Sequence, residues 1–276
     1  MLMSKSVALL VGGVLCAAEI SAVEGQQPIT DRVFAMHRAT SIPGEDPAVR
    51  WPLAPRRRRL GAWAENQHGE HYLFGPSAIP LEGGEGYYHT AYMILHSAWI
   101  APVNGLAVGG GFQALSVIAS FRGVNDPIVF LGLRGSVPVG NGIHLGLFGL
   151  GAPPSTAAPF HQPAIPVPHV ALGVAQVTLG DHDLQITGSF GWGTTASGLT
   201  EHPAFALGGL LRITDRVAFI SENWSLPFGR EPYRIYTYGV RFMHRKFAGD
   251  VAFLINREFT RFFATGIPYV GIALRF

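Results

Sequence analysis

The chain has 276 residues, of which 48% are hydrophobic and only 14% are charged, so it is long enough for one sizeable domain and too apolar to be disordered. Its net charge of +2 is too small to indicate a nucleic-acid partner. Glycine (35) and proline (20) are frequent while apolar residues stay well distributed, which favours many short strands joined by turns.

Residues 1–22 have the order of a secretory signal peptide: a positive charge, then the apolar stretch 7–15, then small residues. Cleavage is expected after Ala18 or Ala22. The apolar stretch is about half as long as a membrane-spanning helix, so an N-terminal anchor is the weaker interpretation. Cys16, the one cysteine of the chain, lies in this segment. Lipid attachment to Cys16 is the alternative to its removal with the signal peptide.

Residues 23–68 have no regular apolar period and are rich in proline and charge, so we expect a flexible periplasmic leader. The arginine run 56–59 could bind lipid phosphates through bidentate hydrogen bonds. Solvated linker charge is the commoner explanation for such a run.

From residue 69 to residue 276, apolar stretches of about nine to thirteen residues are separated by turn chemistry, and this is the length that a tilted strand needs to cross a bilayer. We therefore predict an all-β fold, a transmembrane antiparallel up-and-down barrel of twelve strands, with ten strands as the alternative. The expected strands are 70–78, 86–99, 106–118, 127–138, 142–150, 168–178, 183–193, 203–213, 216–226, 233–244, 247–256 and 267–276.

Short and long connections alternate between these strands. Tight turns that contain Gly, Asn or Asp are expected at 104–105, 140–142, 180–182 and 214–215, and a further tight turn is expected around 245–246. Longer links are expected at 79–85, 119–126, 151–167, 194–202, 227–232 and 257–266. Such an alternation is typical of outer-membrane barrels of Gram-negative bacteria that have both termini in the periplasm.

Alternation along each strand assigns its two faces, because successive side chains point to opposite sides of a sheet. An arginine facing lipid at mid-bilayer costs about 2–4 kcal/mol, so the face without arginine is expected to contact lipid. A soluble, lipocalin-like barrel would invert the two faces and is the competing structure. Aromatic residues near strand ends suit an interfacial girdle, namely Trp99, Trp192, Tyr236 and Phe242.

The C-terminal pattern Val270, Ile272, Leu274 and Phe276 resembles the signal that barrel-assembly machinery reads in outer-membrane proteins. The stretches 72–81 (YLFGPSAIPL), 84–88 (GEGYY), 221–224 (SENW) and 266–270 (GIPYV) are similar to a group of outer-membrane barrel proteins. The resemblance covers roughly residues 63 to 276. It implies the architecture and the location but no activity. The expected partners are outer-membrane lipids and the assembly machinery.

The side chains of the lumen are therefore the ones that indicate a function. The side chains expected there are His96, Arg134, His144, Gln185, Arg212, Glu222, Arg241, Asp250 and Arg275. Arginines outnumber carboxylates among them, which favours a porin-like passive channel for small solutes with a mild anion preference. Alternatively, these charges pair and close the lumen, with Glu222 bound to Arg212 or Arg241, and the barrel is structural or binds a partner through its loops.

A lipid-modifying enzyme is the third hypothesis, but the sequence shows no catalytic constellation. Acyl transfer needs a nucleophile and a base within hydrogen-bond reach. The neighbours His96 and Ser97 would lie on opposite faces of a strand, as would His89 and Thr90. No cofactor and no metal site are expected, and the solute stays unidentified.

Overall fold

The computed structural model describes residues 66–121, 127–152, 170–229, 231–257, 260 and 265–276. The predicted signal peptide with Cys16, and the predicted leader up to residue 65, lie outside the described residues. Nearly all of the predicted loop 151–167 lies outside them as well.

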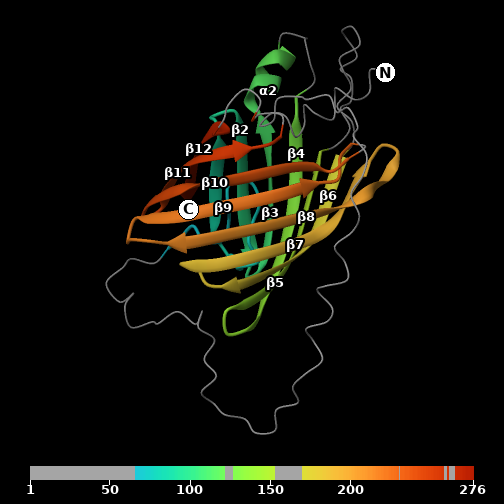
Figure 1. The fold of residues 1–276 in the computed structure, drawn as a ribbon. Helices are drawn as coiled ribbons and strands as arrows, with labels where there is room; N and C mark the ends of the chain where they lie inside the picture. The colour runs from blue at the N-terminus through green and yellow to red at the C-terminus, as the bar shows by residue number, and fades with distance from the viewer. Residues whose placement is uncertain (1–65, 122–126, 153–169, 230, 258–259, 261–264) are drawn as a thin grey trace, which may run out of the picture.

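Twelve strands form one closed barrel, in which every strand is antiparallel to its two neighbours (Figure 1). Consecutive strands pair along the chain, and β12 pairs with β1 to close the ring. The bounds are β1 Gly86–Ala91, β2 Leu95–Val103, β3 Leu106–Gln113, β4 Val129–Gly140, β5 Ile143–Ala152, β6 Val170–Gly180, β7 Leu184–Thr195, β8 Gly198–Arg212, β9 Val217–Leu226, β10 Tyr233–His244, β11 Phe247–Ile255 and β12 Ile267–Arg275. The predicted all-β up-and-down barrel of twelve strands is confirmed, and the ten-stranded alternative is wrong.

Five short connections lie at one end of the barrel, at 104–105, 141–142, 181–183, 213–216 and 245–246. We call this the turn end, and the opposite end the loop end. The chain enters β1 at the turn end, where Gly86 and Phe276 exchange two backbone hydrogen bonds of 3.0 and 2.9 Å. The barrel therefore begins and finishes at the same end.

The predicted first strand, 70–78, is wrong. This segment belongs to no strand of the barrel wall and has only one isolated β-bridge, between His71 and Pro76 of the segment itself. Its sequence contains Gly75 and Pro76, and proline cannot donate to a strand ladder. The expected link 79–85 is likewise no loop between strands, because it leads from this segment into β1.

The predicted strand 86–99 is in fact two strands, so the total of twelve is kept. The chain reverses at Tyr92 and Met93, which both have positive φ, 54° and 55°, and Ile94 N–H donates to the Ala91 carbonyl at 3.0 Å. Two consecutive positive φ values are the signature of a tight hairpin turn, for which Asn and Gly are the usual residues. Tyr and Met give no such signal, which is why the sequence hid this turn.

The predicted strand 106–118 ends early, at Gln113, and the helix α2, Ala114–Phe121, follows it at the loop end (Figure 1). The side chain of Gln113 accepts a hydrogen bond from Ser116 N–H, as a helix N-cap does. Ser116 Oγ in turn donates to the Gln113 carbonyl at 2.7 Å. No helix of the described residues is long and apolar enough to cross a membrane.

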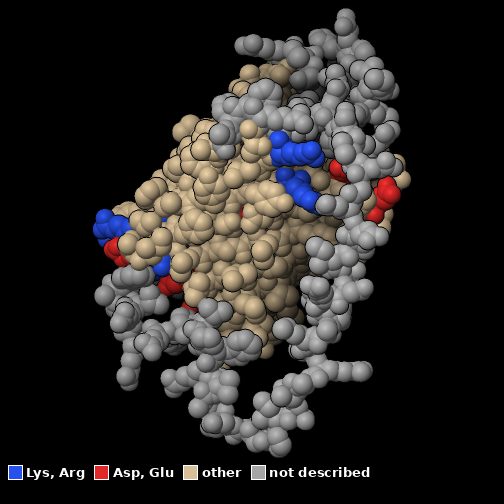
Figure 2. Space-filling model, viewed as in Figure 1, with Lys and Arg blue, Asp and Glu red and all other residues tan. Residues whose placement is uncertain are grey.

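The outer wall is a belt of large apolar side chains. Figure 2 shows one broad face without charge, with the charged side chains at its margins. The residues that alternation placed outward are exposed, for example Leu131, Leu133 and Val137 of β4 at 68, 53 and 56%. Trp99 was expected in an outer girdle, but it is buried inside the barrel, where its ring lies 5.8 Å from that of Phe148.

Two apolar clusters join residues 72–81, which lie inside the barrel, to the wall. Tyr72 and Leu73 pack with a group on β8 to β12 that includes Leu210, Ile220 and Leu254. Leu81 packs with a group on the other side of the barrel that includes Tyr87 and Trp99. The core of this protein thus lies inside the barrel and around residues 72–81.

An arginine at the outward position Leu147, in the middle of β5, tests whether this wall faces lipid. We expect Leu147→Arg to lower the free energy of unfolding in lipid vesicles by about 2–4 kcal/mol, and Val139→Arg, also outward but beside the turn at 141–142, by only about 0–1 kcal/mol. Denaturant titration of both variants measures this. Equal costs at the two positions would contradict a lipid-facing wall.

Candidate functional site

Residues 66–81 form a plug inside the barrel. The plug enters at the turn end, where the Asn66 amide donates to the carbonyl of His182. It turns back at 72–75, with Tyr72 N–H bonded to the Gly75 carbonyl at 2.8 Å, and returns to the turn end, where Gly105 N–H donates to the Leu81 carbonyl at 2.9 Å. The turn at 72–75 is therefore the tip of the plug.

Polar side chains of the wall bind the backbone of the plug. Such bonds are needed because a buried backbone group without a partner costs free energy. Four of these side chains donate to plug carbonyls: Arg134 to Ile79, Gln176 to Pro76, Gln185 to Gly69 and Tyr269 to Leu73. The Thr178 hydroxyl accepts a hydrogen bond from Ala78 N–H. Besides these bonds to the backbone, the Tyr72 hydroxyl bonds to that of Thr187 at 2.7 Å.

Arg241 makes the largest set of these contacts. Its guanidinium forms two hydrogen bonds with the Asp250 carboxylate, at 2.7 and 2.9 Å, and both side chains are fully buried. The remaining N–H groups donate to three plug carbonyls, those of His68 (2.6 Å), His71 (2.8 Å) and Tyr72 (2.9 Å). Asp250 thus offsets a buried charge whose other hydrogen bonds all hold the plug.

Glu222 binds the tip of the plug as a hydrogen-bond acceptor, whereas Arg241 binds the plug as a donor. Its two carboxylate oxygens accept hydrogen bonds from Phe74 N–H at 2.7 Å, Gly75 N–H at 2.8 Å and the indole N–H of Trp224 at 2.7 Å. A Cβ on Gly75 would lie 2.8 Å from the Trp224 ring and 2.9 Å from a Glu222 oxygen. Only glycine fits this close approach of the plug to the wall.

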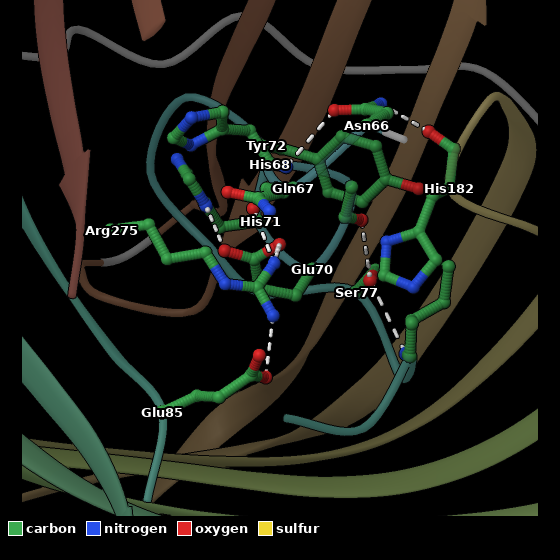
Figure 3. A network of polar contacts seen from close by, with 12 residues as sticks. Asn66, Gln67, His68, Glu70, His71, Tyr72, Ser77, Glu85, His182 and Arg275 are labelled. Carbon is green, nitrogen blue, oxygen red and sulfur yellow. Dashed lines mark hydrogen bonds and ion pairs between the residues drawn. The ribbon is translucent and has the colours of Figure 1, made fainter. Parts of the chain in front are cut away.

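A second charged network fixes the base of the plug. Figure 3 shows Glu70 between His71 and Arg275, with Arg275 reaching on to Glu85. The Glu70 carboxylate lies 3.3 Å from His71 Nδ1 and 3.7 Å from a guanidinium nitrogen of Arg275. Arg275 also donates to the Gln67 carbonyl at 2.6 Å. A carboxylate only accepts hydrogen bonds, so His71 carries its proton on Nδ1.

The plug holds its histidines neutral. Burial and the neighbouring His71 lower the pKa of His68 from 6.5 to about 4. Burial and the charge of Arg241 also lower the pKa of His71. Burial alone would raise the pKa of Glu70, but the hydrogen bond from His71 and the positive charge of Arg275 hold it well below its usual range.

The structure places the sequence-predicted lumen residues as follows. Arg134, Gln185, Glu222, Arg241 and Asp250 lie buried inside the barrel against the plug or beside it. His144, Arg212 and Arg275 also point inward and lie near the turn end.

The placement of His96 in the lumen is wrong. It pairs with Phe112 across β2 and β3, and its ring stacks on that of Phe112, which is 41% exposed on the outer wall. The strand that contains His96 starts only at Leu95, after the hidden turn at 92–93, so the expected register did not apply. The next residue, Ser97, points inward and faces His89 across the strand pair.

The expected partners of Glu222 are also wrong. Arg212 pairs with Asp183 at 2.8 Å, and Arg241 pairs with Asp250, so neither arginine binds Glu222. Of the assembly pattern, Val270, Leu274 and Phe276 lie exposed on the outer wall at 50, 44 and 56%. Ile272 shares their face of β12.

Above the tip of the plug, the lumen contains an apolar chamber of about 230 Å³ near the loop end. Leu73, Phe74 and Gly75 of the plug form part of its lining. Its walls carry aromatic and aliphatic side chains from most of the strands, including Trp99, Phe130, Phe148, Leu150, Leu172 and Trp224. The lumen thus changes from polar beside the plug to apolar above it.

Sequence reasoning missed both the plug and the chamber. The FGP sequence at 74–76 is a turn signal inside the expected strand, and it was the one hint that the strand was interrupted. The inward position of Trp99 depends on the hidden turn at Tyr92 and Met93, so the chamber could not be inferred before β1 and β2 were separated.

Comparison with solved structures finds a similarity to the crystal structure of the outer membrane protein Omp33 of Acinetobacter baumannii. The identity is 12%, the match covers 70% of this chain and 95% of that chain, and the TM-score is 0.31. No family model and no curated protein matches the chain. The barrel itself is established by its own strand pairing.

The neutral His68 makes seating of the plug depend on pH. In the free segment His68 would protonate with a pKa near 6.5, whereas in the seated plug its pKa is about 4. Its contribution to stability is therefore complete above pH 6.5 and is lost as the pH falls from 6.5 to about 4. Glu70, whose pKa is depressed from 4.5, adds a further loss at lower pH.

We expect the urea midpoint of wild type to fall over this pH range more steeply than that of His68→Gln. Denaturant titration at a series of pH values measures the difference. His244→Gln, in an exposed position at the end of β10, is the matched control and should follow wild type. Parallel profiles for wild type and His68→Gln would contradict a neutral His68 in the seated plug.

Proposed function

We propose that this chain is an outer-membrane β-barrel of a Gram-negative bacterium, with both ends of the barrel domain on the periplasmic side, and that it is a passage for small solutes held closed by the plug. The apolar outer wall and the polar inner wall beside the plug support a position in lipid, whose molecules are the partner that such a wall requires. Short periplasmic turns are the rule in such barrels, and this supports the orientation.

The observation that carries the proposal is the way in which the plug is held. Its backbone is bound by polar side chains from β4, β6, β7, β9, β10 and β12. Each of these side chains can exchange its bond to the plug for a bond to water at a small net cost. A lumen packed shut with apolar side chains would have no such second state, so the polar contacts favour a removable gate.

The anion preference expected from the sequence would belong to the open state alone. While the plug is seated, Arg134 is bound to a plug carbonyl, and Arg241 and Arg275 are bound to plug carbonyls and to carboxylates. With the plug displaced, these guanidinium groups would face a water-filled lumen, and a ring of positive charge favours anions.

A closed structural or surface-binding barrel is the second candidate, favoured by the almost complete burial of residues 68–73. For a lipid-modifying enzyme, the described residues offer His89 opposite Ser97 inside the chamber, with no hydrogen bond between them among the described contacts. That arrangement lacks the nucleophile-to-base contact that acyl transfer needs.

Planar-bilayer recording on the refolded protein tests the gate. We expect wild type to be silent for most of the time, and Arg241→Met/Asp250→Leu, which removes three bonds to the plug without leaving a buried unpaired charge, to open more often. Arg216→Met, at an exposed ion pair with Asp215, is the control and should behave as wild type.

In the open state of the double variant, reversal potentials under a salt gradient should still show a preference for anions, because Arg134 and Arg275 remain. A double variant that folds and stays silent would contradict the gate and leave the closed barrel as the function. Steady wild-type conductance equal to that of the variant would contradict a closed resting state.

A further inference from the structure

The apolar chamber above the plug is not explained by closure alone. Lumens that hold water are lined by polar side chains, and the part of this lumen beside the plug follows that rule. Between the tip of the plug and the loop end, a cavity of about 230 Å³ is instead surrounded by apolar side chains, among them Trp99, Phe148, Leu172 and Trp224. Side chains that served only to pack the lumen shut would leave no such space.

The size and charge of the chamber define what fits. An apolar cavity of about 150 Å³ in another protein is large enough to bind benzene, so this chamber has room for a single ring with a short substituent. Among the lining residues that the structure describes, His89 is the only one with an ionisable side chain. A charged molecule would therefore lose its hydration without gaining a counter-charge.

One wall of the chamber is polar. Ser97 of β2 and His89 of β1 lie directly opposite each other on the inner face, and both line the chamber. His89 Nε2 already contacts the Tyr269 hydroxyl at 3.3 Å, whereas the Ser97 hydroxyl has no hydrogen-bond partner among the described residues. The serine is thus available to a ligand.

We propose that the chamber binds a small neutral molecule that is mainly apolar, of the size of a substituted benzene, with one hydrogen-bonding group directed at Ser97. This inference rests on the proposed function, since it places at the loop end of the passage a binding site for neutral solutes, in addition to the preference for anions over cations that the arginines beside the plug would give the open state. The ligand would lie on Leu73 and Phe74, so the tip of the plug would be part of its binding site.

Three compounds with the same ring test the class: benzyl alcohol, toluene and benzoate. Saturation-transfer NMR on the refolded full chain in detergent micelles reports which compound contacts the protein. We expect signals for benzyl alcohol and toluene, the stronger for benzyl alcohol, and none for benzoate. Compound dissolved in the micelles gives the same signal with every variant, so the signal of a variant whose chamber is filled is subtracted from that of wild type.

A matched pair on β6 locates the site. Leu172→Trp places a large ring in the chamber and should abolish binding, whereas Leu179→Trp, on the outer wall of the same strand, should leave it unchanged. Ala152→Leu is a smaller filling substitution in case Leu172→Trp does not fold. Ser97→Ala should remove the advantage of benzyl alcohol over toluene.

Binding that survives both filling substitutions, or benzoate bound as well as benzyl alcohol, would overturn the inference. An unchanged advantage of benzyl alcohol in Ser97→Ala would overturn the role of the serine. These outcomes are independent of the gate. If the plug opens in bilayer recordings but no compound binds, only the chamber proposal fails. If a compound binds to a barrel that never opens, only the proposed passage fails.

Discussion

A chain segment buried inside a barrel must find partners for its backbone N–H and C=O groups, and the rest of this structure depends on how the wall meets that need. The plug has no strand neighbour to satisfy them. Arg241, Glu222 and Gln176 do so instead, with donors placed at plug carbonyls and the carboxylate placed at plug N–H groups. The polar residues of the inner wall are therefore the binding site for the plug.

The same constraint divides the lumen. Where the plug lies, the wall is polar because the plug presents backbone, and the buried charges of Arg241 and Asp250 are paired. Above the tip at residues 72–75, the described part of the chain places no further backbone segment in the lumen, and the wall becomes apolar around the chamber. In the proposed function, the polar closure is the gate that water can replace, and the apolar chamber beyond it is the site for a neutral solute.

Much of the fold could be predicted from the sequence, because in a barrel each strand shows its two faces by alternation and four of the five short connections at the turn end contain glycine, asparagine or aspartate. The inward positions of Arg134 and Glu222 follow from that alternation. The plug could not be predicted, since its apolar residues pack against the wall and so mimic a strand. The turn at Tyr92 and Met93 adopts positive φ without the residues that favour it. The strand lost at 70–78 and the strand gained at the turn cancel, so the predicted count of twelve is correct, but the predicted faces of His96 and Trp99 are wrong.

Residues 66–81 sit in the lumen of the folded barrel, and a disulfide tests this placement most directly. An ideal Cβ at Gly146, on the inner face of β5, lies 3.0 Å from the Cβ of Ala78 in the plug, a small adjustment from disulfide geometry. With Cys16 replaced by serine, Ala78→Cys/Gly146→Cys should crosslink on oxidation, and Ala78→Cys/Leu145→Cys, with the second cysteine on the outer wall, should not. A folded barrel in which neither pair crosslinks would show that the plug lies outside the lumen, and the account given for the gate would fail with it.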